Sequence, residues 1–369
     1  MNLDKMLPAS QQSAEGQSAL AAYDYELPPE RIAARPARRR VQARLLVLEG
    51  PEAPAHHKVA HLTRYLRTGD LLVMNNTRVV PARIMARKPT GGKVEVLLLS
   101  PAQPLASDDS GQLHQALLKS HRPLNPGAEL VLDQREGLPE MRLKLVTKGE
   151  RGQASIWVPG SGMDLAKQRG QVPLPPYIKR PNGPFEEDAR RYQTVYAACE
   201  GAVAAPTAGL HLSPALLAAL ETRGVETAQL TLHVGYGTFA EPRPEDLAAG
   251  RLHAEWVEIP PETSRAVARA KARGGRVIAV GTTSARALEW RAGPGGVPRP
   301  GSGWCDLLIA EGYEFKALDG LLTNFHLPRT TLLMLVSALA GRRRILAAYA
   351  EAVEKEYRFY SYGDAMLII

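Results

Sequence analysis

The sequence predicts a large, discontinuous mixed α/β domain with a small antiparallel β-barrel domain inserted into it. Short strand-like runs separated by turn residues fill the region from about 63 to 154, and strands alternate with helices after about 155. The length of 369 residues, 44% of them apolar, is enough for roughly two domains with real cores. We therefore expect a main domain of residues 21–62 and 155–369, a barrel of residues 63–154, and a loosely ordered tail of residues 1–20.

The first part of the chain predicts mostly strands. Residues 1–20 are polar without periodicity, and a turn-rich segment with a cluster of arginines leads to the short strand RLLVLEG. The barrel strands are expected in the runs DLLVMNN, KVEVLLLS, ELVLDQ and MRLKLVTKG. Turn residues such as Gly91-Gly92 separate these runs, and this spacing favours an antiparallel barrel.

The second part carries helix start and stop signals. Ser213 is expected to cap a helix whose first residue is Pro214 and which ends near Gly224. The segment PETSRAVARAKARGG begins at a proline and ends at a glycine pair, which is typical of another helix.

Composition narrows the function classes. Lysine and arginine number 46 against 38 acidic residues, so the formal net charge is +8, which suits a polyanionic partner or an ordinary surface with an arginine bias. Only two cysteines are present, and no ligand spacing typical of zinc occurs, so we expect neither disulfides nor a metal. The amino terminus lacks the features of a signal peptide, and the most apolar segment, LLMLVSALA, is far below the ~18 residues that span a bilayer. We expect a cytoplasmic monomer without membrane contact.

A strand-to-helix junction, VIAVGTTSARALEW, is the first candidate for a binding site. Thr282, Thr283 and Ser284 would sit where free backbone N–H groups and the positive end of a helix dipole favour a polar or anionic ligand. The junction has neither a Walker lysine nor the spacing of a dinucleotide loop. Its hydroxyl residues can equally be ordinary helix caps.

Similar junctions recur and bring three histidines to the ends of elements. His211 follows the run AVAAPTAGL, His233 ends the strand LTLHVG, and Asn324 and His326 precede the helix of LLTNFHLPRTTLLMLV. Because the carboxyl ends of strands in an open α/β sheet gather at one edge, we expect these loops to line one crevice. Each histidine taken alone can be a structural residue. Asp364 either points a carboxylate into this crevice or serves as a turn residue.

The order of several motifs resembles one enzyme family. The blocks are YDYELPPERIA, GDLLVMNNTRVVPAR, PLPPYIKR, RYQTVYA, AVAAPTAGLHL, LTLHVGYGTF, GTTSARALE, LLTNFHLPRTTLLMLVSALAG and YRFYSYGDAML. From about Tyr23 to the last residue the chain resembles the S-adenosylmethionine:tRNA ribosyltransferase-isomerases of queuosine biosynthesis. The resemblance implies an α/β domain with an inserted barrel. It also implies transfer and isomerisation of the ribosyl part of S-adenosylmethionine onto 7-aminomethyl-7-deazaguanine at the tRNA wobble position, giving epoxyqueuosine-tRNA, adenine and methionine.

The implied chemistry needs acid and base groups but no cofactor, because S-adenosylmethionine is consumed as a substrate. A sulfonium acidifies the neighbouring carbon, so a base with a pKa near neutrality and an acid for the departing adenine suffice. We expect these roles, without deciding between acid and base, from His211, His233 and His326, with Asp364 and Glu289 orienting or charging them. The expected substrate-binding residues are Thr207, Gly209, Thr282, Thr283, Ser284, Arg286, Asn324 and Tyr362.

Contact with tRNA is expected mainly through phosphates. The candidate residues are Arg38, Arg39, Arg40, Arg78, Lys179 and Arg180. Arg78 flanks a turn and can also be an exposed loop charge. Tyr177, Tyr192 and Tyr362 can stack on an unpaired base or simply pack in the interior.

One departure and two alternatives accompany this interpretation. The run EDLAAGRLHAE has no histidine just before His253, where the family usually has one, so a role for His253 is doubtful. A tRNA methyltransferase is the first alternative, and it would release S-adenosylhomocysteine instead of adenine. A tRNA-binding module without catalysis is the second, and it leaves the histidine-bearing junctions unexplained.

Overall fold

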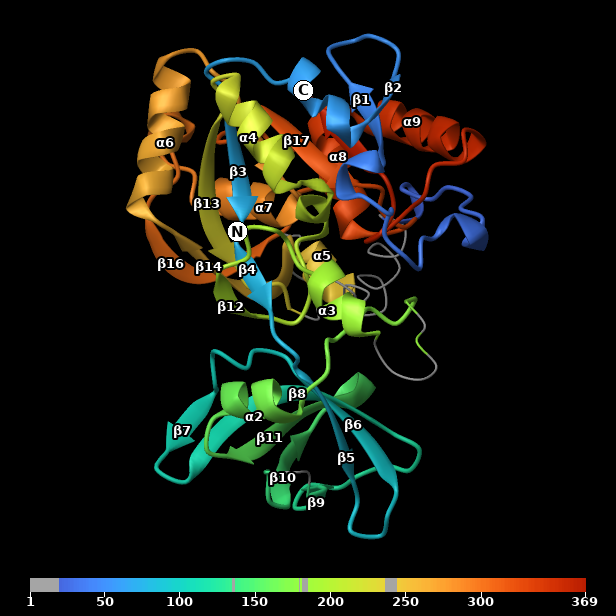
Figure 1. Cartoon of the computed structure of the whole chain (residues 1–369), viewed down its shortest axis with the longest axis vertical. Helices are drawn as coiled ribbons and strands as arrows, with labels where there is room; N and C mark the ends of the chain where they lie inside the picture. Colours follow the sequence, from blue (N-terminus) through green and yellow to red (C-terminus); the bar gives the residue numbers. More distant parts are fainter. Residues whose placement is uncertain (1–19, 135–136, 179, 181–184, 236–243) are drawn as a thin grey trace, which may run out of the picture.

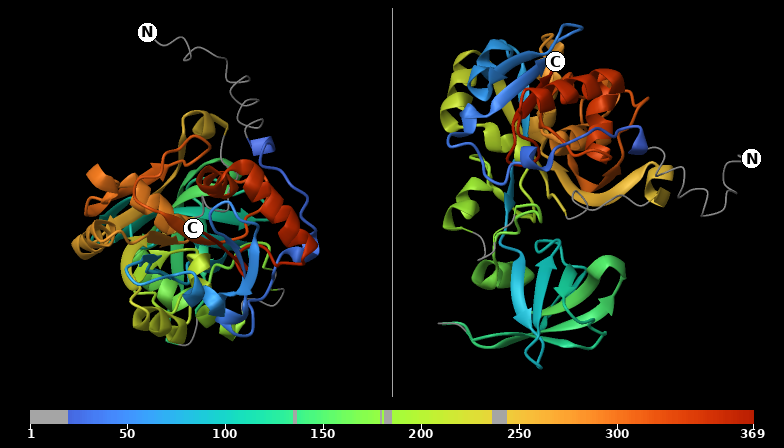
Figure 2. Two further views of the ribbon diagram at one scale, coloured as in Figure 1. Left: turned by 90° about the horizontal axis from the view of Figure 1, so that it is seen from above. Right: turned by 90° about the vertical axis from the view of Figure 1, so that its right-hand side faces the viewer.

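The computed structural model describes residues 20–134, 137–178, 180, 185–235 and 244–369. A mixed sheet with helices on its faces forms the larger part, and a small barrel lies to one side of it (Figure 1). The right-hand view of Figure 2 shows the barrel as a separate body at one end of the molecule. The predicted fold class is confirmed, whereas the tail predicted for residues 1–20 falls almost entirely outside the described residues.

The larger part is built on a nine-stranded sheet with the order β16-β14-β13-β3-β15-β17-β18-β1-β2. Its middle strands β13, β3, β15 and β17 are parallel, while β18 is antiparallel to β17. The strands are β1 (Arg44–Leu48), β2 (Ala55–Lys58), β3 (Leu71–Asn75), β13 (Glu226–Leu232), β14 (Arg251–Ile259), β15 (Val277–Val280), β16 (Gly301–Leu307), β17 (Gly320–Asn324) and β18 (Ala365–Ile368).

Both faces of this sheet are covered, and its central strand β15 is apolar at every position. In β15, Val277 and Ala279 join one core cluster and Ile278 and Val280 join another on the opposite face. This pattern is typical of parallel strands buried on both sides. The helices are α2 (Gly162–Arg169), α3 (Glu186–Arg191), α4 (Pro214–Thr222), α5 (Pro244–Ala248), α6 (Pro261–Ala272), α7 (Thr282–Trp290), α8 (Thr331–Ala340) and α9 (Arg342–Glu354).

The helix signals in the sequence were read correctly for two of these helices. The Ser213 side chain accepts a hydrogen bond from the backbone N–H of Leu216, and Pro214 is the first residue of α4. Helix α6 begins at Pro261 and ends before the glycine pair at 274–275.

The smaller part is a closed barrel of six antiparallel strands. The strand order β11-β10-β9-β5-β6-β8 closes through the pairing of β11 with β8, and β7 extends the sheet beside β8. Leucine, valine and isoleucine side chains fill its interior, among them Val96, Leu130 and Ile156. The strands are β5 (Arg83–Arg87), β6 (Lys93–Leu98), β7 (Ala106–Asp108), β8 (Gly111–Ser120), β9 (Glu129–Leu132), β10 (Met141–Lys148) and β11 (Gln153–Pro159).

One predicted barrel strand belongs elsewhere. The run DLLVMNN was placed in the barrel, but it forms β3, which pairs with β13 and β15 in the centre of the nine-stranded sheet. All residues of β3 are buried, whereas the barrel strand β10 alternates between buried and exposed positions over most of its length. A strand buried on both faces therefore belongs to the covered sheet.

The chain passes between the two parts through neighbouring strands. β4 (Thr77–Val79) leads toward the barrel, and β12 (Cys199–Ala202), which follows the barrel in the chain, pairs with β4 in parallel. In Figure 1 the arrows of β3 and β4 point toward the barrel, so the carboxyl ends of the parallel strands lie on the barrel side of the sheet.

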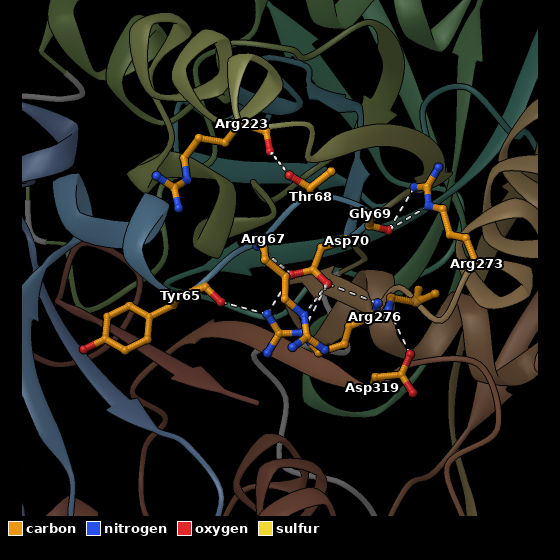
Figure 3. A network of polar contacts seen from close by, with 10 residues as sticks. Tyr65, Arg67, Thr68, Gly69, Asp70, Arg223, Arg273, Arg276 and Asp319 are labelled. Atoms are coloured by element: carbon orange, nitrogen blue, oxygen red, sulfur yellow. Dashed lines mark hydrogen bonds and ion pairs between the residues drawn. The ribbon is translucent and has the colours of Figure 1, made fainter.

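The opposite, amino-terminal edge of the sheet is closed by a network of charges (Figure 3). The fully buried carboxylate of Asp70 accepts hydrogen bonds from the backbone of Arg67 and from the backbone and guanidinium of Arg276. Arg276 also donates to the Tyr65 carbonyl at 2.7 Å, and the Val277 N–H donates to Asp319 at 2.8 Å. These contacts connect the starts of β3 and β15.

Candidate active site

A pocket of about 550 Å³ lies at the carboxyl ends of β15 and β17. Residues from the junction before α7 and from the loop after β17 line it together with the 205–208 and 360–361 segments. Five residues named from the sequence line it: Thr207, Thr282, Thr283, Asn324 and His326. The expected convergence of distant loops on one crevice is therefore present in the structure.

Helix α7 points its amino terminus into this pocket without a side-chain cap. Its cap residue is Gly281, with φ of +88°, which provides no side-chain cap for the first turn. Ser161, Ser213 and Thr330 cap α2, α4 and α8 in the ordinary way. The ordinary-cap interpretation is therefore wrong for α7, whose free N–H groups are available to a ligand.

Asn324 connects the pocket to His211. Its amide Nδ2 donates to the Tyr360 carbonyl at 3.0 Å, which fixes the orientation of the amide because a carbonyl can only accept. The same nitrogen lies 3.2 Å from Nε2 of His211, which must therefore be an unprotonated acceptor. The Oδ1 atom of Asn324 is buried without a hydrogen-bond partner among the described residues. A buried orphan acceptor next to a pocket indicates a place for a ligand donor.

His326 and His233 differ in their distance from the pocket lining. His326 lines the pocket, and its Nε2 lies 3.0 Å from the Thr323 hydroxyl. His233 is not among the lining residues, and its Nδ1 contacts the Thr77 hydroxyl at 2.8 Å. The structure thus brings His211 and His326 to the site and sets His233 behind it.

Burial keeps these imidazoles neutral at pH 7. It lowers the pKa of His326 to about 3 and that of His233 to about 4. For His211, burial and then the charges of Arg358 and Arg40 lower the pKa to about 3. These pKa values lie below the near-neutral value expected for the base, because burial disfavours the charged imidazolium.

Two residues of α7 expected at the site face other partners. The Glu289 carboxylate accepts from the backbone N–H groups of Lys316, Ala317 and Leu318, so it holds the loop before β17 and does not reach the histidines. Arg286 forms a buried ion pair with Glu255 of β14, and its Nε donates to the Leu307 carbonyl at 3.0 Å. Neither residue lines the pocket, so the structure does not bring these two residues to the other site candidates.

Asp364 serves as a turn residue. Its carboxylate accepts hydrogen bonds from the backbone N–H groups of Arg44 and Arg358 at 2.9 and 2.8 Å, which ties the final loop to the start of β1. Among the described residues, none of its hydrogen bonds or ion pairs involves a histidine.

Ser284 and Gly209 also have structural placements. The Ser284 hydroxyl donates to the carbonyl of Val280, the last residue of β15. A Cβ on Gly209 would lie 2.0 Å from the Tyr196 hydroxyl, so close packing requires glycine there.

Tyr360 is a lining residue that sequence reasoning missed. It adopts φ of +74°, a left-handed conformation that a bulky residue rarely occupies, and its ring centroid lies 4.4 Å from that of Tyr177. Such outliers concentrate at functional sites, where the surrounding structure maintains them. Its signal in the sequence was only its position two residues before Tyr362.

A second pocket, of about 290 Å³, adjoins the first. Arg40, Arg191, His211, Ser361 and Tyr362 contribute to its lining, and Ser361 lines both pockets. Tyr362 was expected to bind substrate in the crevice, and it lies instead in this second pocket. Arg191 was not named from the sequence, although it stands within the quoted block RYQTVYA.

The other residues expected to contact tRNA differ in their exposure to solvent. Arg38 and Arg39 are exposed beside the second pocket, and Arg78 is exposed with its guanidinium on the Ala197 carbonyl. Arg180 forms a nearly buried ion pair with Asp188 at 2.9 Å. Lys179 lies outside the described residues.

Of the tyrosines expected to stack on an unpaired base, Tyr192 is buried in the interior. Tyr192 is fully buried and packs edge-to-face on Tyr362, with ring centroids 5.8 Å apart, so it has a packing role.

Among the described residues, no group of three or more histidine, cysteine or acidic side chains is arranged to hold a metal ion. No helix in the described part of the chain is long and apolar enough to cross a membrane.

Comparison with known proteins gives consistent results over nearly the whole chain. A family model described as "Queuosine biosynthesis protein" matches residues 20–368. The chain is 47% identical over 366 residues to the S-adenosylmethionine:tRNA ribosyltransferase-isomerase of Nitratidesulfovibrio vulgaris strain DP4, covering 95% of this chain and 97% of that protein. It is 49% identical over 352 residues to the protein of the same name from Gloeobacter violaceus, covering 94% and 95% of the two chains.

A solved structure is similar as well. The crystal structure of S-adenosylmethionine tRNA ribosyltransferase from Thermotoga maritima matches with a TM-score of 0.52 and 33% identity. The match covers 94% of this chain and 100% of the other.

Proposed function

The chain belongs to the S-adenosylmethionine:tRNA ribosyltransferase-isomerase family, and we propose that it transfers the ribosyl part of S-adenosylmethionine to a tRNA base. In this proposal the acceptor is 7-aminomethyl-7-deazaguanine at the wobble position. The transferred group isomerises to the epoxycyclopentane of epoxyqueuosine, and adenine and methionine leave. No cofactor or metal takes part.

One observation carries the proposal: the pocket joins an uncapped helix end, the orphan Asn324 Oδ1 and two neutral histidines at one edge of the sheet. The helix end favours the carboxylate of the methionine part, since free N–H groups and the helix dipole both attract an anion. Asn324 Oδ1 accepts from a ribose hydroxyl or the adenine amino group, which removes the cost of its unsatisfied state.

The neutral state of the histidines suits a cationic substrate. A sulfonium next to an imidazolium would be repelled, whereas a neutral imidazole can accept the proton that the sulfonium acidifies. His326 lines the pocket and His211 adjoins it through Asn324, so we assign the acid/base work to these two residues. His233, Asp364 and Glu289 act on the scaffold in this proposal.

The decisive experiment is an adenine-release assay. The protein is incubated with S-adenosylmethionine and tRNA that carries the aminomethyl base, and the products are separated by chromatography. The proposal expects free adenine, free methionine and a matching gain in tRNA mass. S-adenosylhomocysteine with methylated RNA would instead identify a methyltransferase, and binding without any product would identify a module that only binds tRNA.

A further inference from the structure

The second pocket carries two arginines that form no ion pair with a carboxylate in the part of the chain that the structure describes. Arg40 donates to the backbone carbonyls of Leu210 and Gln193 at 2.9 and 2.7 Å, and Arg191 donates to the carbonyls of Ala37 and Arg38. Neither arginine forms an ion pair with any acidic residue in the described parts of the chain. Carbonyls hold the guanidinium groups in place but leave their full charge, so the pocket attracts an anion.

A buried hydroxyl adds a third donor. Tyr362 lines the pocket and is 2% exposed, and its hydroxyl has no hydrogen-bond partner among the described residues. Burial raises the pKa of Tyr362, so the hydroxyl keeps its proton and is free to donate. Two guanidinium groups and a phenol provide donors almost exclusively, which matches a phosphate group because phosphate oxygens only accept.

The pocket is placed beside the site of chemistry. His211 lines it directly, and His211 is also joined to Asn324 of the first pocket. Ser361 contributes to both linings. A ligand that fills both pockets must therefore present an anionic group a short distance from the group that reacts, as a nucleotide of an RNA chain does.

We propose that the arginine pocket formed by Arg40, Arg191 and Tyr362 binds a backbone phosphate of the RNA substrate next to the nucleotide whose base reacts in the first pocket. The inference rests on the proposed function and adds the position of the phosphate. The exposed Arg38 and Arg39 continue the positive surface from this pocket, which favours a polymer over a free phosphate ion.

The test measures binding of an unmodified tRNA anticodon stem-loop to the full-length protein by fluorescence anisotropy at several salt concentrations. Arg191→Gln removes the charge, and Arg191→Lys keeps it while losing the bidentate geometry. Arg291→Gln is the matched control, because Arg291 is also half-buried and donates only to backbone carbonyls, those of Arg299 and Pro300. Tyr362→Phe removes only the unpartnered hydroxyl.

The expected RNA affinities distinguish loss of the Arg191 charge from damage to the fold. Arg191→Gln should weaken binding roughly tenfold and reduce the salt slope by about 0.7 to 0.9, the value for one phosphate contact, while Arg191→Lys should retain most of that slope. Tyr362→Phe should weaken binding severalfold without lowering the melting temperature, since the hydroxyl has no partner to lose. Arg291→Gln should bind as the wild type does.

A chemical change in the RNA locates the phosphate. Stem-loops with a neutral methylphosphonate at one of the two phosphates that flank the target nucleotide should lose affinity for the wild type, and at the contacted position Arg191→Gln should cause no further loss. Additive losses at both positions would overturn the proposal, as would Arg191→Gln binding no worse than Arg291→Gln. Inorganic phosphate that stabilises the wild type through Arg191, without an effect of Arg191 on RNA binding, would assign the pocket to a free anion and overturn it too.

These binding measurements need no turnover, so the two proposals can fail separately. If the Arg191 dependence holds and no adenine is released, the reaction is wrong and the phosphate pocket stands. If adenine is released and the Arg191 dependence is absent, only the phosphate pocket is wrong.

Discussion

The two edges of the nine-stranded sheet differ in whether their buried polar groups have hydrogen-bond partners. At the amino-terminal edge, Asp70 receives hydrogen bonds from Arg67 and Arg276, and the Gly69 carbonyl accepts two from Arg273 (Figure 3). At the carboxyl edge, α7 has no side-chain cap and Asn324 Oδ1 has no partner among the described residues. Both edges belong to the same strands, β3 and β15 among them.

This difference indicates which polar groups hold the fold and which await a ligand. A buried charge must be paired, and at the amino-terminal edge the pairing joins the starts of the adjacent strands β3 and β15. A buried acceptor without a partner costs about 1 to 3 kcal/mol, a cost that persists at a site whose ligand supplies the missing donor. Substitutions at the two edges should therefore change different properties of the protein.

The largest expected effect is on catalysis at the carboxyl edge. His326→Gln keeps a neutral polar side chain but removes the imidazole, so the rate of adenine release should fall roughly 10² to 10⁴-fold, as for loss of a general acid or base. The melting temperature should change by only a few degrees. Single-turnover adenine release measures the rate, and calorimetry measures the melting temperature.

The exposed His253 of β14 provides the control for this substitution. His253→Gln should retain the wild-type rate. A His326→Gln enzyme that works within threefold of the wild type would remove His326 from the chemistry.

The next effect is on stability at the amino-terminal edge. Asp70→Asn leaves the Arg276 charge without its carboxylate in a position where Asp70 is 0% exposed, so the free energy of unfolding should fall by about 3 to 5 kcal/mol. Activity per folded molecule should be unchanged below the melting transition. Urea unfolding and the adenine assay on the same sample check both statements, and a large activity loss in fully folded protein would show that the two edges are not independent.

A smaller effect is expected on the pH dependence of stability, which should differ between the two edges of the sheet. The pKa of His326 is about 3 when folded and about 6.5 when unfolded, so the unfolded chain takes up the proton first as the pH falls. One such histidine should cost about 2 kcal/mol of stability between about pH 7 and about pH 5, and His326→Gln should remove that dependence.

The amino-terminal edge should respond only in more acidic solution. Burial raises the pKa of Asp70, but hydrogen bonds from Arg276 and Arg67 outweigh it and lower the pKa below 3.8. The stability that Asp70 contributes is therefore present above the unfolded pKa and is lost as the pH falls through the folded one. Asp70→Asn should leave the slope between about pH 7 and about pH 5 unchanged, and a change in that window would contradict the assignment.

The smallest expected effect concerns Tyr360. Tyr360→Asn places a residue that tolerates φ of +74° and removes the ring from the pocket lining. Relief of backbone strain should raise the free energy of unfolding by about 1 kcal/mol. The KM for S-adenosylmethionine should rise roughly tenfold because a stacking surface is lost. A lower stability with an unchanged KM would show that the ring only supports the fold.

The sequence predicted the carboxyl edge better than the partners of individual side chains. The recurrence of polar residues at strand ends placed Thr282, Asn324 and His326 in one pocket, because strand direction alone determines that edge. The sequence did not indicate that Glu289 and Arg286 lie outside the pocket lining, because their partners, the 316–318 backbone and Glu255, are brought close only by tertiary packing.

The same limit explains the other differences. The run DLLVMNN was assigned to the barrel because its apolar residues do not by themselves distinguish a covered sheet from a barrel. The left-handed backbone of Tyr360 has no signature in a single sequence. Arg191 was hidden in a charged stretch whose contacts depend on the fold of residues 37–38.

The uncapped start of α7 has a consequence for the lifetime of the protein. An occupant of the pocket completes the helix, so the filled enzyme resists unfolding more than the empty one. Proteases act on opened chains, and a shortage of the occupant therefore exposes more molecules to degradation. The cellular level of the protein should therefore rise and fall with the concentration of the ligand that binds in the pocket.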